Sequence, residues 1–157
     1  MKTKGLPLPY VEANKQQASY IMAPLTYSKS GEFTTNISGL PIGALRNGAR
    51  ISDLWLSCQE SGKDDTNTLS FTADVLINGT SALDTQPVIA HVSGEASQAK
   101  TSRITGDTGI TQAVMDEDNN LGSVGDTITI DLTLTRTASP TTEIKHPTVV
   151  VEFEPVK

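Results

Sequence analysis

The chain has 157 residues, a net charge of −6 and a single cysteine. A chain of this length can bury roughly 70% of its unfolded surface in one core, so it needs no disulfide for stability. Cys58 cannot form an internal disulfide, and we interpret it as a buried strand residue. No apolar stretch approaches the roughly 18 residues of a membrane span. The N-terminus has prolines where a signal peptide has its apolar run, which predicts a protein made and used without secretion.

The charge is divided unevenly along the chain. Residues 1–50 hold six basic and two acidic side chains, a net charge of +4, whereas residues 51–157 hold six basic and sixteen acidic side chains, a net charge of −10. An acidic body repels nucleic-acid phosphates, and no basic stripe with interleaved aromatic residues is present, so nucleic acid is not an expected partner. The basic N-terminal part suits docking on an acidic protein surface, although ordinary solvation explains its charge equally well.

Residues 1–30 are predicted to form an extended N-terminal arm. Proline fixes φ, removes a backbone donor and restricts the residue before it, so the segment 6–11, with Pro7 and Pro9, cannot be a central strand. The segment 20–23, just before Pro24, is a candidate short strand. Large apolar side chains in such an arm need burial, either against the domain or against a partner chain.

Residues 31–157 are predicted to form a single all-β sandwich, with a jelly roll as the favoured topology. Apolar and polar residues alternate over 69–77, and Asn78-Gly79 follows, which predicts a half-buried strand and a hairpin turn. No stretch of ten residues keeps a helical apolar stripe. About eight short strands are expected, at spacings typical of sandwiches and jelly rolls. Besides 69–77, they include residues 32–37, 49–58, 87–92, 99–105, 127–135 and 149–154.

The cleanest alternating strands define the predicted core. Its members are Leu69, Phe71, Val75, Ile77, Ile130, Leu132, Val149 and Val151. Two features are less regular. The segment 38–41, Ser-Gly-Leu-Pro, is predicted to be a turn that ends the strand before it. The strand 49–58 alternates imperfectly, which predicts burial on both faces or a bulge near Ser52-Asp53.

No catalytic constellation stands out, and the protein is predicted not to be an enzyme. There is no Gly-x-Ser-x-Gly elbow, although spacing alone leaves paired carboxylates for glycan hydrolysis open. His91 and His146 are the only imidazoles, too few for a zinc site without carboxylates, and His91 is expected to be a hydrogen-bonded sheet residue. The acidic loop 116–126 does not match the EF-hand spacing, so no metal and no cofactor are predicted, while calcium binding there stays open.

Three stretches of the chain carry a resemblance. Residues 75–83 (VLINGTSAL), 86–90 (QPVIA) and 134–143 (LTRTASPTTE) resemble stretches of the small head decoration, or cement, proteins of tailed bacteriophages. The resemblance is one of threonine-rich strands and turns. It implies a structural protein on the capsid exterior that bridges neighbouring subunits of the major capsid protein, often as a homotrimer, and that carries no catalytic residues. It would be made in the host cytoplasm, without contact with a membrane.

The arm is the predicted attachment segment of such a protein. Its candidate capsid-binding residues are Lys2, Lys4, Tyr10 and Lys15, because positive charge there contrasts with the acidic body and an extended segment can add to a partner's sheet. The alternative is a carbohydrate- or receptor-binding module of a phage fibre. With three Tyr, three Phe and one Trp the chain is poor in stacking platforms, although one exposed Trp55 or Tyr27 would suffice.

Overall fold

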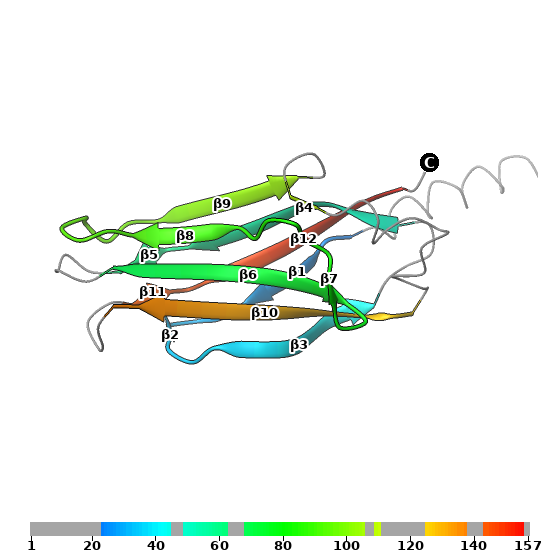
Figure 1. The fold of residues 1–157 in the computed structure, drawn as a ribbon, viewed down its shortest axis with the longest axis horizontal. Helices are drawn as coiled ribbons and strands as arrows, with labels where there is room; N and C mark the ends of the chain where they lie inside the picture. The colour runs from blue at the N-terminus through cyan, green and yellow to red at the C-terminus, as the bar shows by residue number, and fades with distance from the viewer. Residues whose placement is uncertain are drawn as a thin grey trace, which may run out of the picture.

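The computed structural model of the chain describes residues 23–44, 49–62, 68–105, 109–110, 125–137 and 143–155. These residues form twelve β-strands and no helix, and all strand pairs are antiparallel. Figure 1 shows the long strands running along the longest axis of the molecule. The predicted all-β sandwich is therefore confirmed.

Two larger sheets make up the sandwich (Figure 1). The four-stranded sheet has the order β1 (Leu25–Ser28), β12 (Thr148–Pro155), β4 (Ala49–Cys58), β9 (Lys100–Thr105). The five-stranded sheet has the order β3 (Ile37–Ala44), β10 (Thr127–Arg136), β6 (Leu69–Ile77), β7 (Thr80–Ser81), and β8 (Val88–His91) also pairs with β6.

A small third sheet lies at one end of the molecule, on the left in Figure 1. It has the order β2 (Glu32–Phe33), β11 (Ile144–Lys145), β5 (Glu60–Ser61). In the chain, β2 follows β1, β5 follows β4, and β11 precedes β12. The small sheet is thus a continuation of three neighbouring strands, β1, β12 and β4. Each of these strands is interrupted between the two sheets.

The strand β6 confirms the clearest sequence pattern. Its residues alternate between buried and half-buried along the whole strand, and every residue from 69 to 77 is paired with β10. Asn78 and Gly79 have φ angles of 51° and 80°. Two successive positive φ angles are what a tight type I′ hairpin requires, and β7 accordingly pairs back with β6 through Ile77 and Thr80.

The core between the sheets contains all the residues predicted for it. Leu69 is 4% exposed, and the other seven predicted members are fully buried. Phe33 joins them, with its ring 5.0 Å from that of Phe71 at an interplanar angle of 58°. This tilted geometry is one that aromatic pairs prefer, so the two rings contribute beyond the area they bury.

The strand β3 corrects a sequence prediction. Ser38–Pro41 was expected to end a strand that began at residue 32, but β3 runs through these residues from Ile37 to Ala44. Pro41 is tolerated because β3 ends the strand order of its sheet, where one side of a strand needs no donors. Gly39, at a φ of 65°, lies at an irregular register with β10 and donates its N–H to Asp131 Oδ1 at 2.7 Å.

The predicted bulge in β4 is confirmed. Asp53 pairs with Glu152 while Ile51 pairs with Phe153, so Ser52 is the extra residue. The bulge shifts the alternation, which explains how Ile51 and Leu54 can both be buried on a strand whose sequence alternates imperfectly.

The four residues of β1 lie within the predicted arm and pair with β12 from Leu25↔Val151 to Ser28↔Thr148. The side chain of Leu25 packs on Gly43 of β3, where an added Cβ would lie 2.6 Å from Leu25 Cδ1. Sheet pairing therefore begins by residue 25. Residues 1–22 lie outside the described residues, and the division into an arm and a domain stays a prediction.

Candidate functional site

The predicted capsid-binding residues Lys2, Lys4, Tyr10 and Lys15 lie outside the described residues, as does most of the acidic loop 116–126. Contact of the arm with a capsid therefore stays a prediction, and calcium binding by the loop stays open. Among the described residues, two other features bring together polar side chains as a binding site does. One is the outer face of the four-stranded sheet, and the other is the network around Glu95.

Trp55 lies on the outer face of the four-stranded sheet. It pairs with Val150 on one side and Arg103 on the other. The Arg103 guanidinium lies 4.6 Å from the centroid of the Trp55 ring, and Arg103 Nε donates to an Asp53 carboxylate oxygen at 2.7 Å. A cation held over an indole is a favourable contact, and here it covers the ring. Trp55 is half-buried, so it does not offer the open stacking surface that a sugar binder uses.

Tyr27, the other aromatic residue considered for sugar binding, is half-buried and packs against the hydrophobic core. Its position on β1 places its ring on the inner face, because the neighbouring Ser28 is exposed on the outer one. Neither aromatic residue therefore forms an open platform.

A hollow of about 380 Å³ opens where the four-stranded sheet meets the small sheet. Most of the residues that line it have polar side chains. Hydroxyl groups come from Ser28, Ser30, Ser57 and Thr148, and further side chains come from Lys29, Gln59, His146 and Cys58. Ser28, Thr148 and Ser57 are directly opposite one another on three neighbouring strands, which places their side chains in one row on the outer face.

The break between the two sheets builds this hollow. Three backbone hydrogen bonds span it, from Lys29 N to Pro147 O at 3.1 Å, from Gln59 N to Lys145 O at 3.0 Å, and from His146 N to Gly31 O at 2.8 Å. His146 has a φ of 50°, a left-handed conformation that is uncommon for a residue other than glycine. The chain thus turns sharply between β11 and β12 while the neighbouring strands stay attached.

The ring of His146 is fixed by its neighbour. Gly31 N donates to His146 Nδ1 at 3.1 Å. A nitrogen that accepts a hydrogen bond carries no proton, so the neutral imidazole carries its proton on Nε2. The ring that lines the hollow is therefore a donor through Nε2.

Cys58 contributes little chemistry to the hollow. It is 5% exposed, and burial raises the pKa of its thiol, although a hydrogen bond with the Lys100 backbone and the charge of Lys100 act in the opposite direction. A thiol with a raised pKa is mostly protonated at neutral pH, and the thiolate is the nucleophile. The interpretation of Cys58 as a buried strand residue is confirmed.

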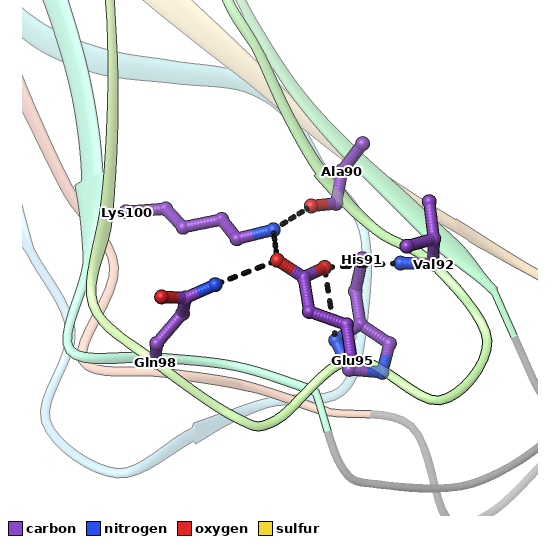
Figure 2. A network of polar contacts seen from close by, with 6 residues as sticks. All are labelled: Ala90, His91, Val92, Glu95, Gln98 and Lys100. Carbon is purple, nitrogen blue, oxygen red and sulfur yellow. Dashed lines mark hydrogen bonds and ion pairs between the residues drawn. The ribbon is translucent and has the colours of Figure 1, made fainter.

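The second polar feature is the network around Glu95, shown in Figure 2. Glu95 Oε1 lies 2.6 Å from Lys100 Nζ and accepts from Gln98 Nε2 at 2.6 Å. Glu95 Oε2 accepts from Val92 N at 3.2 Å, and Lys100 Nζ also donates to the carbonyl of Ala90 at 2.5 Å. These contacts tie the loop after β8 to the start of β9.

His91 corrects a sequence prediction within the same network. It is a sheet residue and 1% exposed, but neither ring nitrogen has a hydrogen-bond partner among the described residues. Its Nδ1 lies 3.7 Å from Glu95 Oε2, which is beyond hydrogen-bond distance (Figure 2). Its ring instead packs against Gly62, where an added Cβ would lie 2.7 Å from His91 Cγ.

Replacing Glu95 by glutamine tests the network through pH. The hydrogen bond from Lys100 is the largest cause that lowers the pKa of Glu95 from 4.5 to about 2, followed by the Val92 N–H. A lowered folded-state pKa adds stability that is complete above pH 4.5 and lost as the pH falls towards 2. We therefore expect the melting temperature of E95Q to fall below that of the natural protein at neutral pH and to converge with it near pH 2.

The measurement is a series of melting curves from neutral to acid pH for both proteins. Glu32→Gln serves as the control, because no described residue forms an ion pair with Glu32, and its melting temperature at neutral pH should stay close to that of the natural protein. A constant difference for E95Q across the whole series would contradict the stabilising role of the charged carboxylate.

Within the described ranges, no three His, Cys, Asp or Glu residues gather in a way that could hold a metal ion. The same part of the chain contains no helix of the length and apolarity that crossing a membrane requires. Searches against known protein families and curated proteins find no match for this chain.

Proposed function

We propose that the protein is a structural virion protein, which decorates a phage capsid and ties neighbouring subunits of the major capsid protein together on the capsid exterior. The resemblance of residues 75–83 and 134–143 to phage decoration proteins supports this proposal. In the fold, residues 75–77 and 134–136 belong to β6 and β10, which pair along their whole common length. Part of each of these two stretches therefore lies in a central strand of the five-stranded sheet.

The observation that carries the proposal is the order in which the strands pair. The eight strands of four or more residues pair as one long hairpin: β1 with β12, β3 with β10, β4 with β9, and β6 with β8. Along each half of the chain these strands alternate between the two sheets. We infer a jelly-roll topology from this nested order, a fold that is common in viral capsid and lectin domains.

The arm is the proposed attachment segment, through Lys2, Lys4, Tyr10 and Lys15. The described part of this segment contains β1, which ends the strand order of its sheet and so lies at a sheet edge. The charge of the N-terminal part supports docking on an acidic capsid surface, because residues 1–50, which include the arm, have a net charge of +4 against −10 for the rest. A homotrimer would raise capsid affinity, since linked sites gain ~10²–10⁴ in avidity without new types of contact.

Co-sedimentation with phage heads that lack the protein tests the proposal. The full chain is expected to bind, a chain without residues 1–20 is expected to bind more weakly, and replacing Lys2, Lys4 and Lys15 by glutamine is expected to weaken binding less. Exposed charges contribute modestly and are screened within ~8 Å at physiological ionic strength, so the lysine variant should also lose salt sensitivity.

Two further measurements complete the test. The melting temperature of the truncated chain should match that of the full chain, because β1 and the core strands remain. Light scattering of the full chain is expected to give three times 16.7 kDa. Absence of binding by the full chain contradicts the decoration function, and equal binding by the truncated chain assigns the contacts to the sandwich instead of the arm.

A carbohydrate- or receptor-binding module is the second candidate, and the hollow beside His146 is the observation that favours it. Hydroxyl, amide and amino groups in one concave place suit the hydrogen-bonding groups of a sugar. Glycan-array binding by the full chain would distinguish this function from capsid attachment, because a decoration protein that binds only capsid subunits gives no signal on the array.

A further inference from the structure

The hollow between the four-stranded and small sheets plays no part in the proposed capsid attachment through the arm. Its lining, its charge and its size together point to a ligand. We infer that the hollow binds an anionic sugar, one that carries a carboxylate or a phosphate group, with Lys29 and His146 facing the anionic group. This inference does not depend on the decoration function.

The charges around the hollow favour an anion. None of the described residues that line the hollow carries a carboxylate, although the chain has a net charge of −6. Four other cations of the described residues face carboxylates: Arg50 faces Glu154, Lys100 faces Glu95, Arg103 faces Asp53 and Lys145 faces Glu60. Lys29 differs, because its Nζ lies 5.7 Å from the centroid of the Phe33 ring and no carboxylate of the described residues pairs with it. Among the described residues, therefore, no acidic partner competes with a ligand for this charge.

His146 adds a donor whose position is fixed. Its Nδ1 accepts from Gly31 N, and its own backbone N–H donates to Gly31 O at 2.8 Å, so both the ring and the backbone are held by one neighbour. The proton on Nε2 is then available to an oxygen of the ligand. A donor held in place before binding costs less conformational entropy than a mobile one.

The rest of the lining suits the hydroxyl groups of a sugar. Ser28 Oγ and Thr148 Oγ1 lie 3.0 Å apart, so one hydroxyl donates to the other and one O–H of the pair stays free. Ser57 lies next to Thr148 in the same row, and Gln59 follows two residues later. A volume of about 380 Å³ exceeds what an inorganic ion fills and lies within the range of small-molecule sites.

The test is a titration of the full chain, followed by the shifts of its backbone amide signals in NMR. The probes are glucuronate, glucose 6-phosphate and glucose. Both anionic probes are expected to shift signals around residues 28–30, 57–59 and 146–148, whereas glucose is expected to bind at least about tenfold more weakly, because hydrogen bonds to charged groups are the stronger ones. A preference between the two anionic probes identifies which anionic group the site prefers.

Two variants assign the binding to the hollow. Lys29→Gln removes the charge, and His146→Asn removes the ring while keeping a residue that tolerates a left-handed φ. Each is expected to weaken glucuronate or glucose 6-phosphate binding about tenfold. Arg50→Gln, which removes a charge from the opposite end of β4, is the matched control and is expected to leave binding unchanged. Unchanged amide spectra away from the substitution show that each variant is folded.

Several results would overturn the inference. Equal binding of glucose and the anionic probes would show that charge plays no part. Equal weakening by Lys29→Gln and Arg50→Gln would show a general effect of net charge. The absence of shifts around the hollow with both anionic probes would show that it is not a site for them. Failure of capsid attachment, by contrast, leaves all these expectations in place.

Discussion

Replacing Phe71 by alanine is expected to lower the free energy of unfolding by about 3–5 kcal/mol. Phe71 is fully buried on β6 between the two sheets, and its ring contacts that of Phe33. The substitution removes the buried area, leaves a cavity that a two-sheet core closes only in part, and ends the aromatic contact. Because small domains are stable by only about 5–15 kcal/mol, this loss is a large share of the total.

Denaturant unfolding measures this effect as a shift of the midpoint with an unchanged slope. Phe71→Leu keeps an apolar side chain and should cost distinctly less. Thr72→Ala, on the outer face of the same strand, is the control and should change stability by no more than about 0.5 kcal/mol. A loss for Phe71→Ala no larger than that for Thr72→Ala would show that the ring does not pack in the core as described.

The sequence predicted the core well because the side chains of a sandwich strand follow a period of two. Burial then depends on the local alternation, as in β6 and β10. Edge strands do not share this regularity. The strand β3 ends the strand order of its sheet, so it tolerates Gly39 and Pro41 in positions that a local pattern assigns to a turn.

The hollow could not be predicted from local patterns because its residues come from three distant parts of the chain. Ser28, Ser57 and Thr148 lie in one row only because β1, β12 and β4 are neighbours, and that order is a property of the whole topology. Serine and threonine are common in this chain, so no single member stood out. His146 before Pro147 was visible in the sequence, but proline disfavours helix at the residue before it without specifying a left-handed φ.

For the predicted site residues, the sequence could not show which partner they contact. The prediction for Lys2, Lys4, Tyr10 and Lys15 rests on charge and proline content, which indicate an accessible segment without saying what it contacts. A partner surface decides that contact, and no pattern in a single chain contains it. The fold does not distinguish among functions, because sandwiches host many unrelated ones. The head-binding experiment is therefore the test of the contact between arm and capsid.

Replacing Gly62 by alanine is expected to cost about 3 kcal/mol, the second large effect. Two causes add. Gly62 has a φ of 104°, which side-chain-bearing residues rarely adopt and which costs roughly 1–3 kcal/mol. The new Cβ would also lie 2.7 Å from Cγ of His91, a ring that is 1% exposed, and overpacking a core costs roughly 1–3 kcal/mol.

Gly79 separates the two causes. Its φ of 80° is also positive, but an added Cβ would meet no atom within 4 Å, so Gly79→Ala should cost only the conformational part, about 1 kcal/mol. A double-mutant cycle isolates the other part. In a His91→Ala background the contact is gone, and Gly62→Ala should become cheaper by about 1–2 kcal/mol.

Chemical denaturation of the four proteins of the cycle and of Gly79→Ala measures these differences. Equal costs for Gly62→Ala and Gly79→Ala, with no coupling to position 91, would show that the imidazole can move. The enclosed ring without hydrogen-bond partners would then not describe the protein in solution. A clear coupling instead assigns the buried imidazole a packing role, in which its shape against the Gly62 backbone matters.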